Sequence, residues 1–223
     1  MKISYLVTCC NETDTLDRLL AFLEEHHAEE IIVLFDIPPS QATLGVVQKY
    51  MGVPGLFIKS HALAADYGAH KNYGNSQCTG DWVFQIDGDE LPSKDLMDNL
   101  ETIIESNPNV ELIFVPRIND FRGVTPEHAK QWGWRLTPSP HCNNRPVVNW
   151  PDHQGRIYRR VPERIKWDRK LHEKIEGHRE YSFLPADEGW ALYHDKTIEK
   201  QMETNVRYNK VFTEADNKGH SLV

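Results

Sequence analysis

Short apolar runs and helical spacings alternate along the first half of the chain. Runs rich in β-branched and aromatic residues predict buried strands at residues 3–9, 30–35, 55–58, 82–86 and 110–116. Apolar residues at helical spacing predict helices around 16–23 and at 40–51, 65–78 and 93–105. Asn11 or Thr13 is expected to cap the first helix. Strands that alternate with helices indicate an α/β fold whose central sheet is mixed, mostly parallel and flanked by helices.

The pattern changes after residue 118. Residues 119–168 contain six prolines and four tryptophans with little regular periodicity, which predicts long loops and short strands wrapped over the sheet. A final helix is expected at about 196–214, and the tail at 215–223 is expected to fray. At 223 residues the chain is long enough for one sizeable α/β domain and short for two.

The acidic tetrad Asp87-Gly88-Asp89-Glu90 directly follows the predicted strand at 82–86. Open α/β sheets bind ligands where their strands end. Two carboxylates on either side of a glycine can converge on one hard divalent cation, Mn²⁺ or Mg²⁺, and leave coordination sites free for phosphates. A solvated acidic turn before a helix capped by Ser93 explains the same residues equally well.

Composition narrows the class of protein. With 39% hydrophobic and 26% charged residues and a net charge of −8, the chain reads as a soluble globular protein. No run approaches the roughly 20 apolar residues of a membrane span, and the first apolar run is too short for a signal peptide. We therefore expect an intracellular, cytoplasmic protein. Its four cysteines lack metal or disulfide spacing, so reduced thiols are expected, and a zinc site among the eleven histidines is a minor alternative.

A basic segment lies in the second half. Residues 156–174 carry eight Lys or Arg against three acids. A solvated basic face explains this excess, and contact with phosphate, on a donor or on an anionic acceptor, explains it as well.

Six segments occur in a recognisable order. They are the strand end Asn11-Glu12, the acidic Asp36 after the second strand, the helix at 66–74, the strand and tetrad at 80–90, the pair His172-Glu173, and the segment 192–194. Together they resemble family 2 glycosyltransferases of GT-A fold, the nucleotide-diphospho-sugar transferase fold. The resemblance covers most of the chain and implies a single GT-A domain over 1–223. This domain is expected to divide into a nucleotide-sugar-binding half (1–118), an acceptor-side half (119–195), and a C-terminal helix and tail (196–223).

The resemblance assigns donor-binding roles residue by residue. Base and ribose contacts are implied for Thr8, Asn11, Glu12 and Asp36. Asn11 as a helix cap, Glu12 as a first-turn acid and Asp36 as a turn residue are the local alternatives. The alternative is strongest for Asp36, because the family usually has two acids there.

Three further residues match the family in the helix at 65–78. Asp66, Lys71 and Asn72 match the family's Asp and Arg-Asn positions. Lys71 replaces the usual arginine, so it keeps a point charge for a diphosphate but loses bidentate geometry.

The resemblance also implies a metal site. Asp89 would bind Mn²⁺ or Mg²⁺ directly, Asp87 would contact the ribose or a metal-bound water, and His194 would supply another ligand. A metal there would neutralise the leaving diphosphate. A buried, hydrogen-bonded histidine is the alternative for His194.

The acceptor side is implied to include the catalytic base. Inverting transfer needs a base within reach of the acceptor hydroxyl, and Glu173 occupies the family's position for it. An ion pair of Glu173 with Lys170, Lys174 or Arg169 is the structural alternative. Glu90 is expected to orient the turn or to face the acceptor, and acceptor-side roles are expected for Asp152, Gln154 and His172. Arg156 is expected to reach the donor phosphates or a neighbouring acid.

These matches imply an inverting, metal-dependent enzyme that moves a sugar from a nucleoside-diphosphate sugar, with a UDP-sugar expected, to an unidentified hydroxyl. A hydroxylated nucleic-acid base stays open as acceptor but is not favoured, because the chain is acidic. A sugar nucleotidyltransferase should have a Gly-rich basic loop after the first strand, which residues 9–13 lack. A haloacid-dehalogenase-like phosphatase also has an Asp-x-Asp motif, but there the motif follows the first strand of the fold. In this chain it follows three strand–helix units. A non-catalytic carbohydrate or nucleotide binder remains the third alternative, and it would have no need of Glu173.

Overall fold

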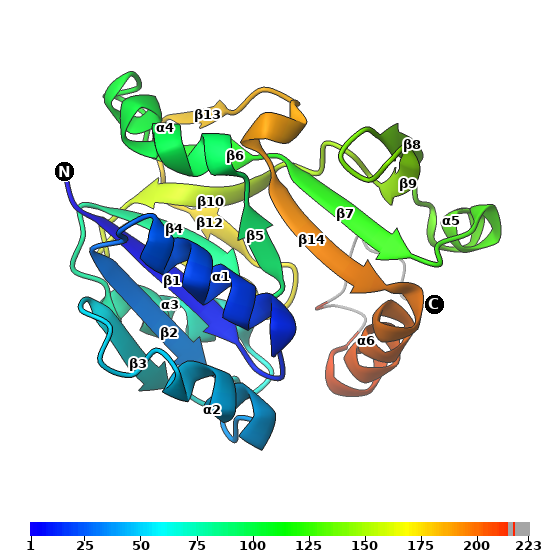
Figure 1. Ribbon diagram of the computed structural model, residues 1–223, viewed down its shortest axis with the longest axis horizontal. Helices are drawn as coiled ribbons and strands as arrows, with labels where there is room; N and C mark the ends of the chain where they lie inside the picture. Colours follow the sequence, from blue (N-terminus) through cyan, green and yellow to red (C-terminus); the bar gives the residue numbers. More distant parts are fainter. Residues whose placement is uncertain (214–215, 217–223) are drawn as a thin grey trace.

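The computed structural model describes residues 1–213 and 216. A seven-stranded sheet forms its centre in the order β13-β6-β10-β4-β1-β2-β3 (Figure 1). These strands are β1 (Ile3–Cys9), β2 (Glu30–Phe35), β3 (Leu56–Ser60), β4 (Trp82–Asp87), β6 (Leu112–Val115), β10 (Gln154–Arg159) and β13 (Tyr181–Phe183). β10 runs antiparallel to β4 and β6, and every other pair in this sheet is parallel. The sheet is therefore mixed and mostly parallel, as the sequence predicted.

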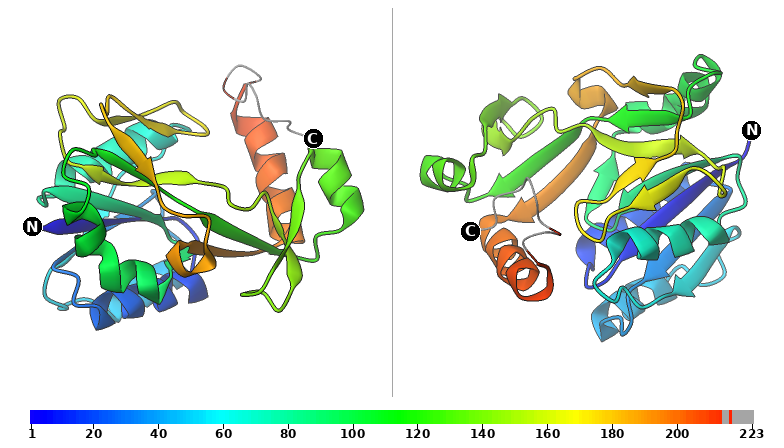
Figure 2. Two further views of the ribbon diagram at one scale, coloured as in Figure 1. Left: turned by 90° about the horizontal axis from the view of Figure 1, so that it is seen from above. Right: turned by 180° about the vertical axis from the view of Figure 1, so that it is seen from behind.

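Side chains alternate between the two faces of the sheet and build a core on each. On one face, Tyr5 and Val7 pack with apolar residues of α1 (Asp14–Glu25), α2 (Gln41–Gln48) and α4 (Lys94–Glu105). On the other face, Leu6 packs beneath α3 (Tyr67–Gln77) and the hairpin of β11 (Lys166–Asp168) and β12 (Lys174–Glu176). Figure 2 shows the two layers from above and from behind. Helices thus cover both faces, which leaves the strand ends for a site.

A second sheet continues from the first in the order β5-β14-β7-β9-β8. Its strands are β5 (Glu90–Pro92), β14 (Leu192–Thr197), β7 (Arg117–Arg122), β9 (Arg145–Val148) and β8 (Leu136–Ser139). β14 pairs antiparallel with β5 and parallel with β7, so His194 lies opposite both Glu90 and Asn119. This sheet brings the end of the chain beside the acidic tetrad.

The remaining helices flank this second sheet. They are α5 (Pro126–Trp132), the 3₁₀ turn at Glu188–Trp190, and α6 (Ile198–Val211), which follows β14 directly. No helix within the described part of the chain is both long and apolar enough to cross a bilayer.

Most predicted elements match the observed ones, and the largest difference lies in the second half of the chain. The strand at 30–35 has the predicted bounds, whereas the helix predicted at 40–51 ends at Gln48. Thr13 is the N-cap of α1, but its side chain makes no capping hydrogen bond. The expected loops at 119–168 contain the ordered strands of the second sheet, whose pairing is non-local. Apart from Asp216, the tail expected to fray lies outside the described residues.

Candidate active site

The site lies where the central parallel strands end. Thr8 on β1 is in register with Asp87 on β4, and its Oγ1 donates a hydrogen bond to Asp87 Oδ1 at 2.8 Å. Gly88 N donates to Thr8 O at 2.8 Å, which turns the tetrad tightly against β1. A Cβ on Gly88 would lie 3.0 Å from Cys9 Cβ and 3.2 Å from Thr8 O. Glycine at this position therefore allows the tetrad to approach β1 closely.

Asp87 is surrounded by donors. Arg156 Nη2 lies 2.7 Å from Asp87 Oδ2, and Lys71 Nζ lies 3.1 Å from Oδ1. Gln85 Nε2 donates to the same Oδ1 at 2.8 Å. Burial acts to raise the pKa of Asp87, but Arg156 and Lys71 outweigh it and hold the pKa well below its usual range. Asp87 is consequently a carboxylate fixed by two cations of this chain.

Glu173 is paired with Lys71, whose Nζ lies 2.7 Å from Glu173 Oε1. Lys71 is 3% exposed, and its Nζ also stands 4.6 Å from the ring centre of Trp167. Burial disfavours the charge on each partner, yet the pair raises the pKa of Lys71 and lowers that of Glu173. The ion pair that the sequence suggested for Glu173, with Lys170, Lys174 or Arg169, is replaced by one with a helix residue far away in sequence.

Asp89 and His194 face each other at 3.2 Å between Oδ2 and Nε2. Asn119 donates both Nδ2 hydrogens, to Val148 O at 3.2 Å and Asp152 Oδ2 at 2.8 Å, so its Oδ1 faces His194 Nδ1 at 2.9 Å. Nδ1 must then carry the hydrogen, which leaves the lone pair of a neutral ring at Nε2.

Two electron-pair donors therefore point at each other in the neutral tautomer. Such a contact requires a cation between them, either a proton or a metal, and metal-binding histidines characteristically donate from the other ring nitrogen. Burial acts to raise the pKa of Asp89, but His194 outweighs it and lowers the pKa to about 2. Asp89 and His194 thus fit a divalent metal by their chemistry.

The third expected metal ligand does not join them. Asp87 is turned toward Arg156 and Lys71, and no group of three or more His, Cys, Asp or Glu gathers around one point within residues 1–213 and 216. The contact expected between Asp87 and a ribose or a metal-bound water stays a prediction.

Glu90 is buried and bridges two arginines. Its Oε1 lies 2.6 Å from Arg156 Nη2 and 3.0 Å from Arg117 Nη1, while its Oε2 accepts from Asp87 N at 3.1 Å. The side chain has no exposed surface. Glu90 was expected to orient the turn or to face the acceptor; in the structure its carboxylate holds the turn through Asp87 N and balances the charges of Arg156 and Arg117.

Asp152 links the tetrad to the second sheet. Arg117 donates to Asp152 Oδ2 from Nε and Nη2 at 3.0 and 2.8 Å, and Gln154 Nε2 donates to Oδ1 at 2.9 Å. Burial acts to raise the pKa of Asp152, but Arg117 and Asn119 outweigh it and lower the pKa. Asp152 and Gln154 are therefore neighbours of the site, held by the same network as His194.

The residues expected at the nucleotide base lie at the ends of β1 and β2. Glu12 Oε2 accepts from the backbone N–H groups of Cys10 and Asn11 at 2.6 and 3.0 Å. Asp36 Oδ1 accepts from Ile37 N and Leu63 N at 2.7 and 2.9 Å. Both carboxylates support local turns here, and Asp36 keeps its Oδ2 free of backbone contacts among the described residues.

The α3 residues hold a neighbouring loop. Asp66 is the N-cap of α3 and accepts from Ala69 N at 2.8 Å. Asn72 exchanges two hydrogen bonds with the backbone of Trp167, at 2.8 and 2.9 Å. Its amide therefore anchors β11, a structural contact that the sequence did not reveal.

The loop that carries Glu173 is held on α3. Tyr67 N and Gly68 N donate to Lys170 O and Arg169 O at 2.9 and 3.2 Å. Arg169 and His172 have positive φ angles of 74° and 53°. This backbone is uncommon for residues other than glycine, so the helix constrains the loop in a conformation that turns Glu173 toward Lys71.

The arginines of the basic segment are mostly used inside the molecule. Arg156 contacts the tetrad, Arg160 donates to Gly80 O at 2.8 Å, and Arg164 pairs with Glu111 at 2.6 Å. Arg159 stacks on Trp82, 4.9 Å from the ring centre. Of these four, only Arg156 reaches the site, and it does so through a neighbouring acid.

Gln85, Arg117 and Asn119 also belong to the site, although the sequence did not predict them. Gln85 Oε1 accepts from Arg156 and also from Lys71 Nζ at 3.3 Å, although the side chain is fully buried. The sequence signal for Gln85 was a polar residue inside the otherwise apolar strand at 82–86. Arg117 and Asn119 gave no comparable signal, because their role depends on strand pairing with β14.

Three comparisons relate the chain to known proteins. The model of the family "Glycosyl transferase family 2" matches residues 4–179. An uncharacterized glycosyltransferase of Rickettsia conorii (strain ATCC VR-613 / Malish 7) is 31% identical over 106 residues, which cover 48% of this chain and 35% of that protein. This chain therefore spans about a third of that relative's length.

The fold is shared with solved structures. The crystal structure of S. aureus TarS 1-349 matches with a TM-score of 0.59 and 18% identity, covering 100% of this chain and 67% of TarS 1-349. A structure of S. aureus TarS matches with a TM-score of 0.60 and 19% identity, over 96% of this chain and 41% of that one. The α/β architecture with its mixed sheet is that of GT-A glycosyltransferases, and the chain belongs to glycosyl transferase family 2.

Proposed function

We propose that this protein is a metal-dependent, inverting glycosyltransferase that moves a sugar from a nucleoside-diphosphate sugar to an acceptor hydroxyl. The observation that carries the proposal is the contact between Asp89 Oδ2 and His194 Nε2 at 3.2 Å, in a tautomer that calls for a cation between them. Family 2 membership favours transfer over nucleotidyl transfer or phosphate hydrolysis.

The donor is proposed to bind at the ends of β1, β2 and β4. Thr8, Asn11, Glu12 and Asp36 line these strand ends, which is where open α/β sheets take nucleotides. S. aureus TarS 1-349 has been solved in complex with UDP-GlcNAc, with a TM-score of 0.55 to this chain. A UDP-sugar is accordingly the proposed donor.

Asp89 and His194 are the proposed holders of Mn²⁺ or Mg²⁺. When bound, the metal supplies charge neutralisation for the departing diphosphate. Asn119 fixes the His194 ring through Nδ1, and Asp152 fixes Asn119 in turn. Asn119 and Asp152 are proposed to orient the His194 ring rather than to bind the metal.

Glu173 is the proposed base. Its lowered pKa keeps the carboxylate ionised near neutral pH, because Lys71 stands beside it. In the reaction, Glu173 accepts the proton of the acceptor hydroxyl while that oxygen bonds to the anomeric carbon. The bond between that carbon and the diphosphate oxygen breaks, and its electron pair leaves with the diphosphate. Lys71, close to both Asp87 and Glu173, is proposed to keep the base oriented.

The half at 119–195 is proposed to select the acceptor, with Asp152, Gln154 and His172 on its side of the site. The basic residues Arg159, Arg160 and Arg164 are used in contacts within the chain. This internal use, together with the net charge of −8, argues against an extended nucleic acid as acceptor. A neutral hydroxyl compound fits the site better.

A donor screen tests the proposal. The purified protein is incubated with UDP-, GDP- and other nucleoside-diphosphate sugars, with and without Mn²⁺, and release of the nucleoside diphosphate is measured. We expect slow, metal-dependent hydrolysis of one donor class without an acceptor. Nucleotide release that is unchanged by chelation, or by Asp89→Ala, would contradict the metal assignment. Failure of every donor to bind in calorimetry would contradict the proposed function.

A further inference from the structure

Three aromatic rings on two neighbouring strands form an exposed cluster at the side of the central sheet that lies away from β3 (Figure 1). Tyr181 and Phe183, both on β13, are 56% and 52% exposed. The ring of Phe114, on β6, stacks on that of Phe183 with 4.6 Å between centroids, and it meets the Tyr181 ring edge-on at 5.8 Å. Adjacent exposed aromatic residues are typical of a surface that binds a ligand. We call these three residues the aromatic cluster.

The aromatic cluster and the candidate active site share one face of the sheet. The parallel register places Phe183 opposite Phe114, and paired residues of neighbouring strands point to the same face. Phe114 packs against the apolar core that lies beneath α3 and the β11–β12 hairpin. Lys71 belongs to α3, and Glu173 directly precedes β12. A ligand at Glu173 can therefore continue toward the cluster without crossing to the other face.

The aromatic cluster also lies at the same edge of the sheet as the site. β6 and β13 run parallel to β4, because β10 is antiparallel to both β4 and β6. Phe183 is the last residue of β13, Phe114 is the last but one of β6, and Asp87 is the last of β4. β6 and β13 stand two and three strands away from β4, which corresponds to about 10 Å and about 14 Å. The rings thus lie beside the reacting centre rather than in it.

A proposed acceptor segment runs directly past the aromatic cluster. The ring of His153 meets the ring of Phe183 edge-on, with 5.1 Å between centroids. His153 stands between Asp152 and Gln154, and Asp152 Oδ2 accepts from Arg117 Nη2 at 2.8 Å within the network of the site. Continuity with this segment places the cluster on the acceptor side.

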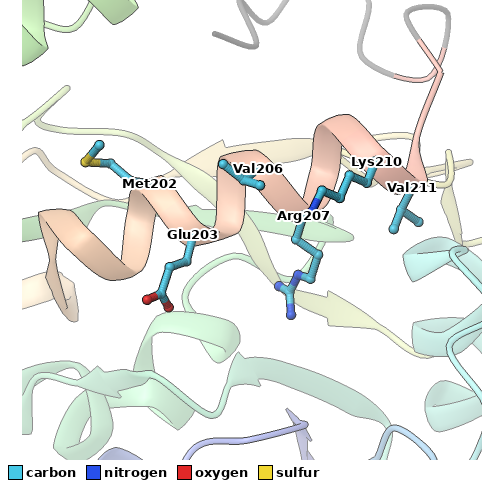
Figure 3. A pocket seen from close by; sticks show the side chains of 6 residues that line it. All are labelled: Met202, Glu203, Val206, Arg207, Lys210 and Val211. Atoms are coloured by element: carbon cyan, nitrogen blue, oxygen red, sulfur yellow. The ribbon is translucent and has the colours of Figure 1, made fainter.

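A second exposed apolar surface, on α6, has a different chemistry. Six residues of α6 line a cavity of about 490 Å³ (Figure 3), namely Met202, Glu203, Val206, Arg207, Lys210 and Val211. These side chains are aliphatic or charged, and they present no aromatic face. β13 reads Tyr181-Ser182-Phe183 and contains no charged residue. An uncharged ligand that packs on aromatic rings therefore fits β13 and not α6.

We propose that Phe114, Tyr181 and Phe183 form a carbohydrate-binding subsite for an oligosaccharide acceptor. The subsite rests on the proposed function, because the reacting hydroxyl would lie at Glu173 and further sugar units over the rings. The C–H groups on one face of a sugar ring carry partial positive charge and pack on the negative face of an aromatic ring. The hydroxyls of the sugar stay in water, which suits rings that are half exposed. The acceptor is thereby narrowed to an uncharged glycan of more than one unit.

Binding of neutral oligosaccharides tests the subsite. Cello- and chito-oligosaccharides, together with glucose and N-acetylglucosamine, are titrated with and without UDP and Mn²⁺, and dissociation constants are measured by saturation-transfer-difference NMR. The proteins are the wild type, Tyr181→Ala, Phe183→Ala, Phe183→Trp and the control Phe57→Ala. Phe57 is 49% exposed on β3, the opposite edge strand of the same sheet, so it matches Phe183 in type and exposure. Circular dichroism and thermal melting confirm that each variant is folded.

We expect the wild type to bind the oligosaccharides more tightly than the monosaccharides. Tyr181→Ala and Phe183→Ala should each weaken oligosaccharide binding by about 2-fold to 10-fold, as for loss of one aromatic contact. Phe183→Trp keeps an aromatic face and should keep the affinity, and Phe57→Ala should bind as the wild type does. UDP affinity, measured by calorimetry, should be the same in every variant, because the cluster lies outside the proposed donor site.

The failures of the two proposals are distinguishable. A wild type that binds UDP but does not prefer oligosaccharides, or a preference that Phe183→Ala retains, would overturn the subsite and leave the donor proposal intact. Oligosaccharide binding that depends on Phe183, without binding of any nucleoside diphosphate, would overturn the proposed transfer and support a glycan-binding surface. Dimerisation that depends on Phe183 in analytical ultracentrifugation, and that oligosaccharides do not affect, would overturn the subsite in favour of an interface between two copies of the chain.

Discussion

Lys71 Nζ lies 2.7 Å from Glu173 Oε1 and 3.1 Å from Asp87 Oδ1, so one buried ammonium joins the carboxylate that ends β4 to the carboxylate that precedes β12. The family-typical arginine at this position would present a wider, planar fork. A lysine reaches both acids as a point charge. The proposed donor side and the proposed base are therefore coupled through a single side chain.

The first prediction concerns Glu173. Glu173→Gln keeps the shape of the side chain but cannot accept a proton, so transfer should fall by about 10²-fold to 10⁴-fold. Donor affinity should hardly change, because the base acts on the acceptor. The measurement compares the transfer rate with the donor dissociation constant.

Lys174→Gln is the matched control, because Lys174 is exposed and adjacent in sequence. It should transfer at the wild-type rate. Near-normal transfer by Glu173→Gln would eliminate it as the base and favour a non-catalytic binder or another carboxylate, such as Asp152.

The second prediction concerns the orientation of His194. Asn119→Ala removes the acceptor at His194 Nδ1 and leaves the ring free to rotate or change tautomer. Loss of such a supporting contact lowers metal affinity by about 10-fold to 100-fold. In a titration of nucleotide release with Mn²⁺, the half-maximal rate should require a higher Mn²⁺ concentration than in the wild type. The maximal rate should be largely regained at saturating Mn²⁺. An unchanged Mn²⁺ requirement would remove His194 from the metal site.

The third prediction concerns Gly88. Gly88→Ala places a methyl group 3.0 Å from Cys9 Cβ and 3.2 Å from Thr8 O. The tetrad must shift, so we expect a loss of about 1–3 kcal/mol in unfolding free energy and weaker binding of donor and Mn²⁺. Gly45→Ala on α2 is the control. Nothing lies within 4 Å of its added Cβ, so it should be neutral or slightly stabilising. Equal behaviour of the two variants would refute the close approach at Gly88.

The fourth prediction concerns the burial of Lys71. Lys71→Met leaves Asp87 and Glu173 without a shared cation. Breaking a buried pair from one side costs about 3–5 kcal/mol. Urea unfolding should show this loss, whereas Lys170→Met, at an exposed lysine in the loop that carries Glu173, should change stability little. A Lys71→Met protein as stable as wild type would mean that water reaches the pair.

The fifth prediction concerns the acid stability of the fold. Glu30 accepts hydrogen bonds from Ser4 and from the backbone and hydroxyl of Thr79, and Lys2 Nζ lies 3.0 Å away. Burial acts to raise the pKa of Glu30, but these donors outweigh it and lower it from 4.5 to about 2. The unfolded chain thus binds the proton more readily, so the contribution of Glu30 is present above pH 4.5 and is lost as pH falls toward 2.

Glu30→Gln should remove part of the pH dependence of stability between these two values, as measured by denaturant unfolding across that window. The neighbouring exposed Glu29 provides the control. Glu29→Gln should keep the wild-type slope. If Glu30→Gln keeps that slope as well, the Glu30 carboxyl titrates alike in the folded and unfolded chain.

The sequence by itself determined the elements of the nucleotide half and their class. Strand 30–35 has the predicted bounds, and Ser93 caps α4 as expected. These features depend on periodicity and on neighbours a few residues away, which a single sequence contains. The ordered motifs also indicated family 2, and the family model agrees. The cytoplasmic location and the residue roles stay predictions.

The contacts between residues of the site were decided by the tertiary structure alone. Asp89 meets His194 across 105 residues, and His194 meets Asn119 across 75. Glu173 pairs with Lys71 rather than with the lysines beside it, and Glu90 turns inward to two arginines. Buried charges take whichever partner the packed sheets bring within reach, and that choice depends on β14 inserting between β5 and β7. Local periodicity fixes the strands, but only the register between distant strands brings their polar residues together.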